Sequence, residues 1–412
     1  MKIHLFLFSI FFLSLLSTAT AQIAGCTDPL ANNFNSSATQ NDGSCTYNEA
    51  SVAPTASFSL AANLTETSGL ISWNSYIWTQ NDSNDLNIYV LDSSNGNLVQ
   101  SYPLNGVTNT DWEEISQDND YVYIGDFGNN SNGNRADLKI LRISKNSILA
   151  GSPLIETISF TYSNQTDFTP AGSNKTDFDC EAFIVSADSI FLFTKQWISK
   201  KTSVYSLAKT PGNYVAKLKS TFDVQGLITG VTYLESKKLV TLCGYSSSLQ
   251  PFVYLLYDFD GNSFFGGNKR KIQVSLPYSQ VEGITTSNGL KYYISNEKFV
   301  QAPFINSPQM LHKLDLSSFL EGYLNNFVYL PEAQRNYSAK ISPNPAHDFI
   351  IVITEKCQSP VTYRIINQSG QIVLVGKLAH ENNRVNISDL SAGIYIVKIG
   401  NEKLQSIKVI KN

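Results

Sequence analysis

The chain has 412 residues, a formal net charge of −4, 16% charged residues and 12% aromatic residues. This length suits a medium-sized domain with smaller attachments. Because no cluster of Lys and Arg alternates with aromatic residues and no glycine-rich phosphate loop is present, the sequence argues against binding of nucleic acids and nucleotides.

The first 21 residues have the pattern of a signal peptide. Lys2 supplies the positive start, residues 5–16 the apolar run, and Ala19-Thr20-Ala21 an A-x-A cleavage site. An uncleaved anchor is the alternative, although the apolar run is short for a membrane span. The sequence therefore predicts an exported protein, in which disulfide bonds can form.

Residues 22–50 contain a short segment bracketed by Cys26 and Cys45, which we predict to form a disulfide. Closing this loop contributes about 3 kcal/mol to a segment without a core of its own. The segment resembles Cys-bracketed, Asp/Asn-rich modules of secreted proteins of the Bacteroidetes, with Phe34 and Ser36 in place of the usual Tyr and Pro. Its Asp and Asn oxygens suit Ca²⁺, but their spacing differs from an EF-hand loop, and turn formation is the alternative.

Residues 51–330 repeat one pattern five times. Each copy opens with a polar or acidic residue, a small residue or Glu, and an apolar residue, and β-rich runs separated by turn residues follow. The openings are Ser68-Gly69-Leu70, Glu113-Glu114-Ile115, Glu181-Ala182-Phe183, Thr229-Gly230-Val231 and Glu282-Gly283-Ile284. A period near fifty residues is typical of four-stranded blades stacked around an axis. The sequence thus predicts an all-β fold with a five-bladed β-propeller.

The position of the fourth strands predicts how the ring closes. Four copies carry a fourth extended run, at residues 98–104, 155–162, 215–222 and 271–276, whereas the fifth has only a poor candidate at residues 327–330. Residues 55–62 precede the first opening as a fourth strand would. We therefore expect this N-terminal strand to complete the last blade, because an open ring would expose strand edges. Residues 164–176 are polar and predict a loop insertion.

Carboxylates gather where the first strands begin and the second strands end, which is one face of a propeller. The crowd comprises Glu66, Asp82, Asp111, Glu113, Glu114, Asp126, Asp179, Glu181, Glu282 and Glu297, with Arg135, Lys195 and Lys298 as nearby cations. A His-free, oxygen-rich set favours Ca²⁺ over Zn²⁺. As candidate Ca²⁺ ligands we select Glu113, Asp126, Asp179, Glu181 and Glu282.

Two other interpretations of these acids stay open. Paired carboxylates act as acid and base in glycoside hydrolases, and Trp112 beside them could stack on a sugar. Alternatively, each acid accepts hydrogen bonds from backbone amides of the next blade and holds the ring together. The histidines after residue 21, His312, His347 and His380, assemble no Ser-His-Asp site at this face.

The remaining cysteines are Cys180, Cys243 and Cys357. Cys180 and Cys243 fall in successive copies and could meet near the channel, but two separate buried thiols are the favoured interpretation. The sequence leaves the state of Cys357 open.

A polar linker at residues 331–340 precedes a small β-rich segment at residues 341–412. Its motifs are a start at Pro343, Asn344 and Pro345, a turn with Gly370, and an L-x-x-G-x-Y segment with Leu390, Gly393 and Tyr395. The segment resembles the type A C-terminal sorting domain of the type IX secretion system. The residues alone indicate only a small antiparallel β domain, for which an adhesive immunoglobulin-like module is the alternative.

This resemblance implies an immunoglobulin-like sandwich, contact with the type IX secretion machinery and passage through the outer membrane. It also implies cleavage of the tail, after which the protein is free or attached to surface lipopolysaccharide. Two functions fit the whole chain. One is a binding or surface protein with a Ca²⁺ site and a glycan or other extracellular ligand; the alternative is a glycoside or phosphoester hydrolase.

Overall fold

The computed structural model describes residues 22–326, 339–354, 361–368, 371–378, 382–399 and 405–412. They belong to two compact units that divide between residues 327 and 328. The expected signal peptide, the strand candidate at residues 327–330, linker residues 331–338, Cys357 and Gly370 lie outside the described residues. No helix within the described ranges is long and apolar enough to cross a membrane.

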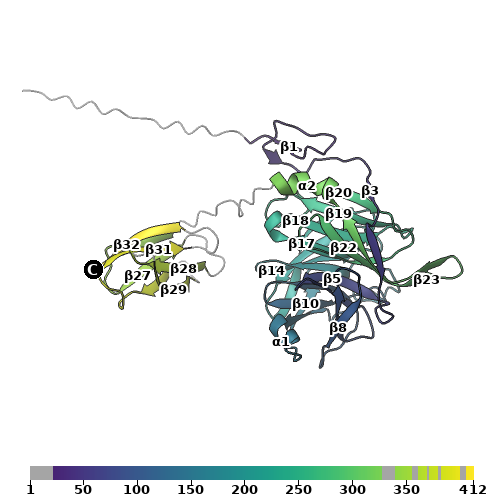
Figure 1. Cartoon of the computed structure of the whole chain (residues 1–412), viewed down its shortest axis with the longest axis horizontal. Coiled ribbons are helices and arrows are strands. Elements are labelled where there is room, and N and C mark those ends of the chain that lie inside the picture. Colours follow the sequence, from purple (N-terminus) through teal and green to yellow (C-terminus); the bar gives the residue numbers. More distant parts are fainter. Residues whose placement is uncertain (1–21, 327–338, 355–360, 369–370, 379–381, 400–404) are drawn as a thin grey trace, which may run out of the picture. The chain divides into compact units, whose positions relative to one another are not determined.

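The larger unit consists of five antiparallel arrays of four strands (Figure 1). The first sheet holds β5 (Thr67–Trp73), β6 (Tyr76–Asn81), β7 (Asn87–Asp92) and β8 (Leu98–Pro103). The second holds β9 (Trp112–Gln117), β10 (Tyr121–Asp126), β11 (Lys139–Ser144) and β12 (Ile155–Tyr162). The third holds β13 (Asp179–Val185), β14 (Ser189–Lys195), β15 (Thr202–Ala208) and β16 (Gly212–Phe222). The fourth holds β17 (Leu227–Leu234), β18 (Leu239–Tyr245), β19 (Pro251–Tyr257) and β20 (Asn268–Val274). The fifth holds β21 (Val281–Thr286), β22 (Lys291–Asn296), β25 (Met310–Asp315) and β4 (Ala56–Ser59).

The first strands of the five sheets contact one another in the cyclic order β5, β9, β13, β17, β21 and again β5. Hydrophobic side chains fill the spaces between neighbouring sheets in five separate clusters. The approach is so close that a Cβ on Gly283 would lie 2.4 Å from the carbonyl oxygen of Ser68. The fold is therefore all-β and β-propeller-like, as the strand pattern predicted.

The N-terminal strand completes the fifth sheet. β4 pairs antiparallel with β25, and Ser57 stands opposite His312. This confirms that the strand before the first opening joins the last sheet. β3 (Ser51–Val52), which was not predicted, adds a short parallel strand to β20.

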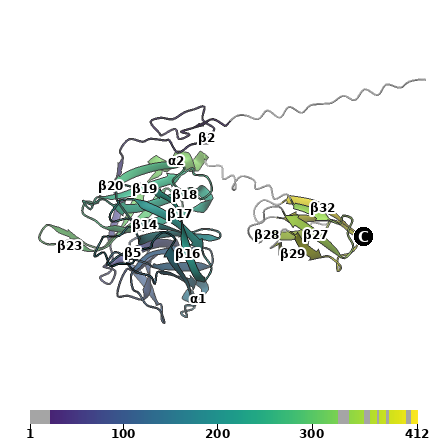
Figure 2. The ribbon, with the colours of Figure 1, turned by 180° about the vertical axis from the view of Figure 1, so that it is seen from behind.

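Other features were also missed by the sequence analysis. β12 and β16 pair in parallel and merge the second and third sheets into one of eight strands. The hairpin of β23 (Phe299–Gln301) and β24 (Ile305–Ser307) projects from the unit in both ribbon views (Figures 1 and 2). The segments α1 (Lys145–Leu149), η1 (Glu235–Lys237) and α2 (Ser317–Asn326) are helical. Leu320 and Leu324 of α2 join the core between the fourth and fifth sheets.

The N-terminal module is closed by the predicted disulfide between Cys26 and Cys45. It contains β1 (Ala24–Gly25) and β2 (Gln40–Asn41). Asp28 accepts hydrogen bonds from the hydroxyls of Tyr47 and Tyr257, the latter on β19, so the module is docked on the fourth sheet. The other oxygen of Asp28 accepts the amide of Leu30, in agreement with a turn-forming role.

The smaller unit has two sheets around one hydrophobic core. One sheet holds β26 (Ala339–Ser342), β27 (Phe349–Thr354) and β30 (Asn382–Asn386); the other holds β29 (Ile372–Leu378), β28 (Val361–Ile366), β31 (Gly393–Ile399) and β32 (Gln405–Lys411). Asn344 donates to the carbonyl of Lys408 at 2.8 Å and accepts from the amide of Ile410 at 2.9 Å. The Pro-Asn-Pro motif is thus tied to the last strand. β26 begins inside the expected linker.

Candidate functional site

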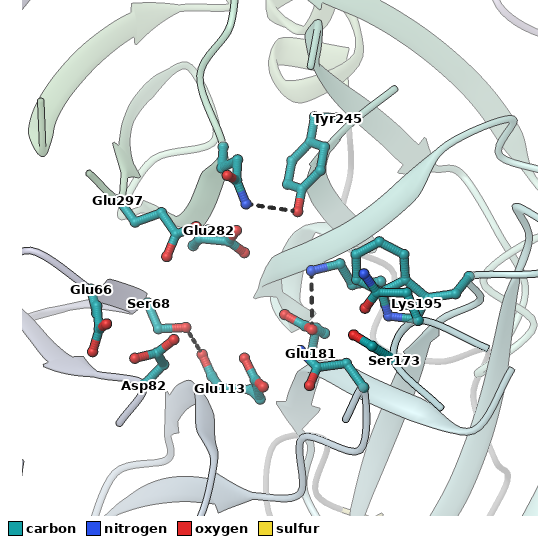
Figure 3. A pocket seen from close by; sticks show the side chains of 14 residues that line it. Glu66, Ser68, Asp82, Glu113, Ser173, Glu181, Lys195, Tyr245, Glu282 and Glu297 are labelled. Carbon is teal, nitrogen blue, oxygen red and sulfur yellow. Dashed lines mark hydrogen bonds and ion pairs between the residues drawn. The ribbon is translucent and has the colours of Figure 1, made fainter. Parts of the chain in front are cut away.

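The starts of the first strands and the ends of the second strands surround a pocket of about 300 Å³ in the larger unit (Figure 3). Its lining is almost entirely polar. It comprises Glu66, Ser68, Asp82, Glu113, Asn130, Ser173, Asn174, Glu181, Lys195, Trp197, Tyr245, Gln280, Glu282 and Glu297. Six of these residues are acidic and one is a lysine. The six are among the ten acids that the repeat placed at this face, whereas Asp111, Glu114, Asp126 and Asp179 do not line the pocket.

A β-bulge in each first strand explains how the acids reach the pocket. Glu113, Glu181 and Glu282 are each skipped in the pairing with the second strand, because their two neighbours pair with consecutive residues there. A bulge leaves one residue unpaired and redirects its side chain. The three glutamates therefore enter the pocket from equivalent positions of the second, third and fifth sheets.

The first and fourth sheets carry hydroxyls at the corresponding bulges, and these hydroxyls join neighbouring sheets. The hydroxyl of Ser68 donates to the backbone carbonyl of Glu113, and that of Thr229 to the carbonyl of Val281. These sheets thus use the bulge residue for a contact between sheets.

One group of residues, which we call the lysine cluster, consists of the pocket residues Glu113, Glu181 and Lys195 and the buried Asp179 beside them. One oxygen of each acid lies within 4.8 Å of the others. At such separations, two carboxylates repel by about 3 kcal/mol at an effective dielectric constant near 20. The Lys195 ammonium offsets this repulsion, because it lies 3.0 Å from Glu181 Oε1.

Further contacts fix the lysine cluster. The ammonium of Lys195 lies 4.8 Å from the ring centre of Trp197 and 5.4 Å from that of Tyr245. Asp179 accepts the amide of Asn129 at 2.6 Å and the indole N–H of Trp197 at 2.7 Å.

Burial opposes charge in the lysine cluster. It raises the pKa of Glu113 and of Asp179 well above the usual range, and the neighbouring Glu181 adds to both shifts. Burial alone would lower the pKa of Lys195, but the nearby carboxylates, led by Glu181, raise it above its usual value. The lysine therefore stays charged and neutralises its acidic neighbours.

The second group, which we call the seam cluster, consists of Glu66, Asp82, Glu282 and Glu297. Glu66 and Asp82 belong to the first sheet, directly before β5 and after β6. Glu282 lies in β21 and Glu297 directly follows β22, both in the fifth sheet. Within the described part of the chain, none of the four carboxylates forms an ion pair.

Burial and mutual repulsion act on the seam cluster. Burial, with Glu66 adding to it, raises the pKa of Asp82 to about 8. Burial also raises the pKa of Glu297 to about 7, and Lys195 partly opposes this shift. Burial raises the pKa of Glu282 well above its usual value. One oxygen each of Asp82 and Glu282 is buried without a hydrogen-bond partner.

The structure separates the five predicted Ca²⁺ ligands. Glu113, Glu181 and Glu282 line the pocket. Asp179 lies within 4.8 Å of Glu113 and Glu181 but does not line it. Asp126 does not line it, because its oxygens contact Arg135 at 2.9 Å and Lys139 at 2.8 Å.

Three other residues correct or extend the sequence analysis. Trp112 is fully buried between the first and second sheets, so the proposal that it stacks on a sugar is wrong. Trp197 lines the pocket instead. Tyr245 was missed, although its place at the end of β18 matches that of Lys195 at the end of β14. Cys180 and Cys243 are separate buried thiols, as predicted.

Comparison with known families identifies the tail. Residues 340–412 match the family described as the secretion system C-terminal sorting domain. This confirms the resemblance seen in the motifs around Asn344 and Tyr395. The protein is therefore one that carries a type IX sorting domain, which implies interaction with the type IX secretion machinery and export to the cell surface or beyond. No curated protein matches the chain.

Solved structures that match this chain include PorZ of Porphyromonas gingivalis, described as an essential bacterial surface component of the type-IX secretion system. It shares 11% identity at a TM-score of 0.29, and the alignment covers 84% of this chain but 45% of PorZ. The chain thus spans less than half the length of PorZ.

Two further structures are similar at the same level. The RRP9 WD40 repeats share 10% identity over 64% of this chain and 99% of theirs, at a TM-score of 0.36. A chain of the mitotic checkpoint complex shares 11% identity over 65% of this chain and 97% of its own, at a TM-score of 0.34. Such low identities and TM-scores say nothing about what this chain binds.

Proposed function

We propose that the protein is an exported, surface-directed five-bladed β-propeller that binds Ca²⁺ in its central pocket. The cyclic contacts of five first strands support five blades. The two sheets around one core support an immunoglobulin-like sandwich for the sorting domain.

The observation that carries the Ca²⁺ proposal is the imbalance of charge in the pocket. Six carboxylates line a cavity of about 300 Å³ in which the lining supplies one lysine. Buried carboxylates are costly unless a cation or a proton neutralises them. The donors offered are oxygens of acids, hydroxyls and amides, without His or Cys, and such hard ligands suit Ca²⁺.

Calorimetric titration of the full chain, first freed of metal with a chelator, tests this proposal. We expect Ca²⁺ to bind and to raise the melting temperature by several degrees, because a ligand at 100 times its dissociation constant stabilises the native state by about 2.7 kcal/mol. Mg²⁺ serves as the control, since it prefers a smaller octahedral shell that retains water. Absence of binding heat, with equal melting in Ca²⁺ and in chelator, would contradict the proposal.

The other expectations of the sequence stay predictions. A hydrolase would turn over a glycoside or phosphoester and lose that turnover in Glu181→Gln or Glu282→Gln. Attachment to lipopolysaccharide and recognition of a glycan rest only on the resemblance and on the exported location.

A further inference from the structure

We propose that the Ca²⁺ ion binds in the seam cluster, between Glu66 and Asp82 of the first sheet and Glu282 and Glu297 of the fifth. This inference rests on the proposed function and names the half of the pocket that performs it. Of the five Ca²⁺ ligands that the sequence suggested, this location keeps only Glu282.

The lysine cluster already contains its cation. The ammonium of Lys195 is 3.0 Å from Glu181 and is enclosed by the rings of Trp197 and Tyr245. Both oxygens of Asp179 accept hydrogen bonds from N–H groups. A metal ion at this place would meet the charge of Lys195 and would have to displace those donors.

The seam cluster has the opposite character. The positive charge of Lys195 partly offsets the rise in the pKa of Glu282 and of Glu297, but Lys195 forms an ion pair with neither residue. Glu282 is only 6% exposed, and its Oε2 has no hydrogen-bond partner among the described residues. Asp82 is half-buried, and its Oδ1 also has no hydrogen-bond partner among the described residues. Figure 3 shows the side chains of Glu66, Asp82, Glu282 and Glu297 around the same pocket. A buried carboxylate oxygen without a partner indicates a ligand that the protein itself does not supply.

Backbone contacts join the segments that carry the four acids. The amide of Asp82 donates to the carbonyl of Glu66 at 3.0 Å, and the amide of Glu297 to that of Gln280 at 3.1 Å. Between the two sheets, the amide of Lys298 donates to the carbonyl of Thr65 at 2.7 Å. The backbone segments that carry the acids are therefore held together across the junction. The carboxylate oxygens are spread more widely than in the lysine cluster, because no three acids of the seam cluster have oxygens within 4.8 Å of one another in the described structure. An ion that binds there would draw the four side chains inward.

The number of oxygens also fits. Ca²⁺ takes six to eight oxygen ligands and accepts carboxylates in one- or two-oxygen contact. Four carboxylates offer up to eight oxygens, and the pocket volume of about 300 Å³ leaves room for water. An ion held there would connect the first sheet to the fifth, which is the junction between the two ends of the ring.

Matched Glu-to-Gln variants of the full chain test the location, because the change keeps size and removes charge. We expect Glu297→Gln and Glu282→Gln each to weaken Ca²⁺ binding at least tenfold. In chelator, both variants should melt at or above the temperature of the parent, because a buried carboxyl that must otherwise bear a repelling charge or take up a proton has been removed. The matched control Glu181→Gln should keep Ca²⁺ affinity within about threefold and melt lower in both buffers, because Lys195 loses its ion pair.

A second variant supplies the missing cation from the chain itself. Glu297→Lys should abolish Ca²⁺ binding. In chelator this variant should melt at a higher temperature than the parent, because the new lysine neutralises the acids of the seam cluster in the way that Lys195 neutralises those of the lysine cluster. If Glu181→Gln instead loses Ca²⁺ binding while Glu282→Gln and Glu297→Gln retain it, the location is wrong and the proposed function stands. If the parent binds no Ca²⁺, the proposed function itself fails.

Discussion

The carboxylate of Glu114 accepts a hydrogen bond of 2.9 Å from the backbone amide of Val231, which lies 117 positions later in the chain. Its other oxygen accepts the amide of Ile115 at 3.0 Å. Glu114 lies in β9 of the second sheet and Val231 in β17 of the fourth, and these sheets are not neighbours in the ring. One fully buried carboxylate thus joins two first strands across the centre of the domain.

Replacing this carboxylate should be costly. Glu114→Gln puts an NH₂ group where one of two backbone amides needs an acceptor, and a buried donor without a partner costs about 1–3 kcal/mol. We expect urea unfolding to show a loss of that size, equal in Ca²⁺ and in chelator. The control is Glu321→Gln, an exposed position of α2, which should change stability little. Equal stability of both variants would show that the bridge does not support the ring.

The strand that closes the fifth sheet gives a second prediction. Deletion of residues 22–62 should lower the melting temperature of the whole β-propeller-like unit in one cooperative transition, because β25 loses its partner β4. Deletion of residues 22–54 is the matched control, since it removes the disulfide module and β3 but keeps β4. If the two deletions melt within a degree or two of each other, the closing role of β4 is wrong.

His312 gives a prediction about pH. Its Nε2 lies 2.8 Å from Oδ1 of Asn296, which only accepts, so this nitrogen carries the proton; Nδ1 then accepts from the hydroxyl of Ser57 at 2.7 Å. Burial lowers the pKa of His312 to about 4, from a usual value of 6.5.

Between these two pH values the unfolded chain binds the proton and the folded chain does not. The contribution of His312 to stability is therefore present above pH 6.5 and is lost as the pH falls towards 4. The loss reaches about 3 kcal/mol, because folding lowers the pKa of His312 from 6.5 to about 4. We expect urea unfolding between pH 4 and 8 to show that the free energy of unfolding of the parent falls with decreasing pH more than that of His312→Gln. Parallel curves of parent and variant would contradict the assignment.

The sorting domain gives a prediction about export. Fusion of residues 339–412 to a periplasmic reporter should send the reporter outside a host with a type IX system, and the mass of the released protein should exclude the tail. The same reporter without these residues is the control. A reporter that stays in the periplasm, or a released protein whose mass includes the tail, would count against the assignment.

Strand positions could be predicted from the sequence because each strand carries a local pattern of Val, Ile, Tyr and Phe between turn residues. The closing role of residues 55–62 followed from the count of strands. The sorting domain was recognisable for the same reason, since Pro343, Asn344 and Tyr395 lie in short motifs. By contrast, β3 and the pairing of β12 with β16 depend on contacts between distant segments.

The division of the pocket could not be predicted. Glu113 and Glu114 are adjacent, and only the bulge decides that the first faces the pocket while the second joins two strands. Asp126 ends a second strand as Lys195 does, but the path of the following loop brings Arg135 against it. Which acids retain unpaired charge therefore depends on loop geometry, which strand periodicity does not encode.

The pairing of Ser57 with His312 also constrains the order of folding, because these residues stand 255 positions apart. A chain that emerges N-terminus first presents β4 long before its partner β25 exists. Contacts at such sequence separation form late, after the intervening sheets have brought the two ends near each other. Until then an unpaired strand edge is open to pairing with other chains. The interval between synthesis and closure is thus the period in which aggregation competes with folding.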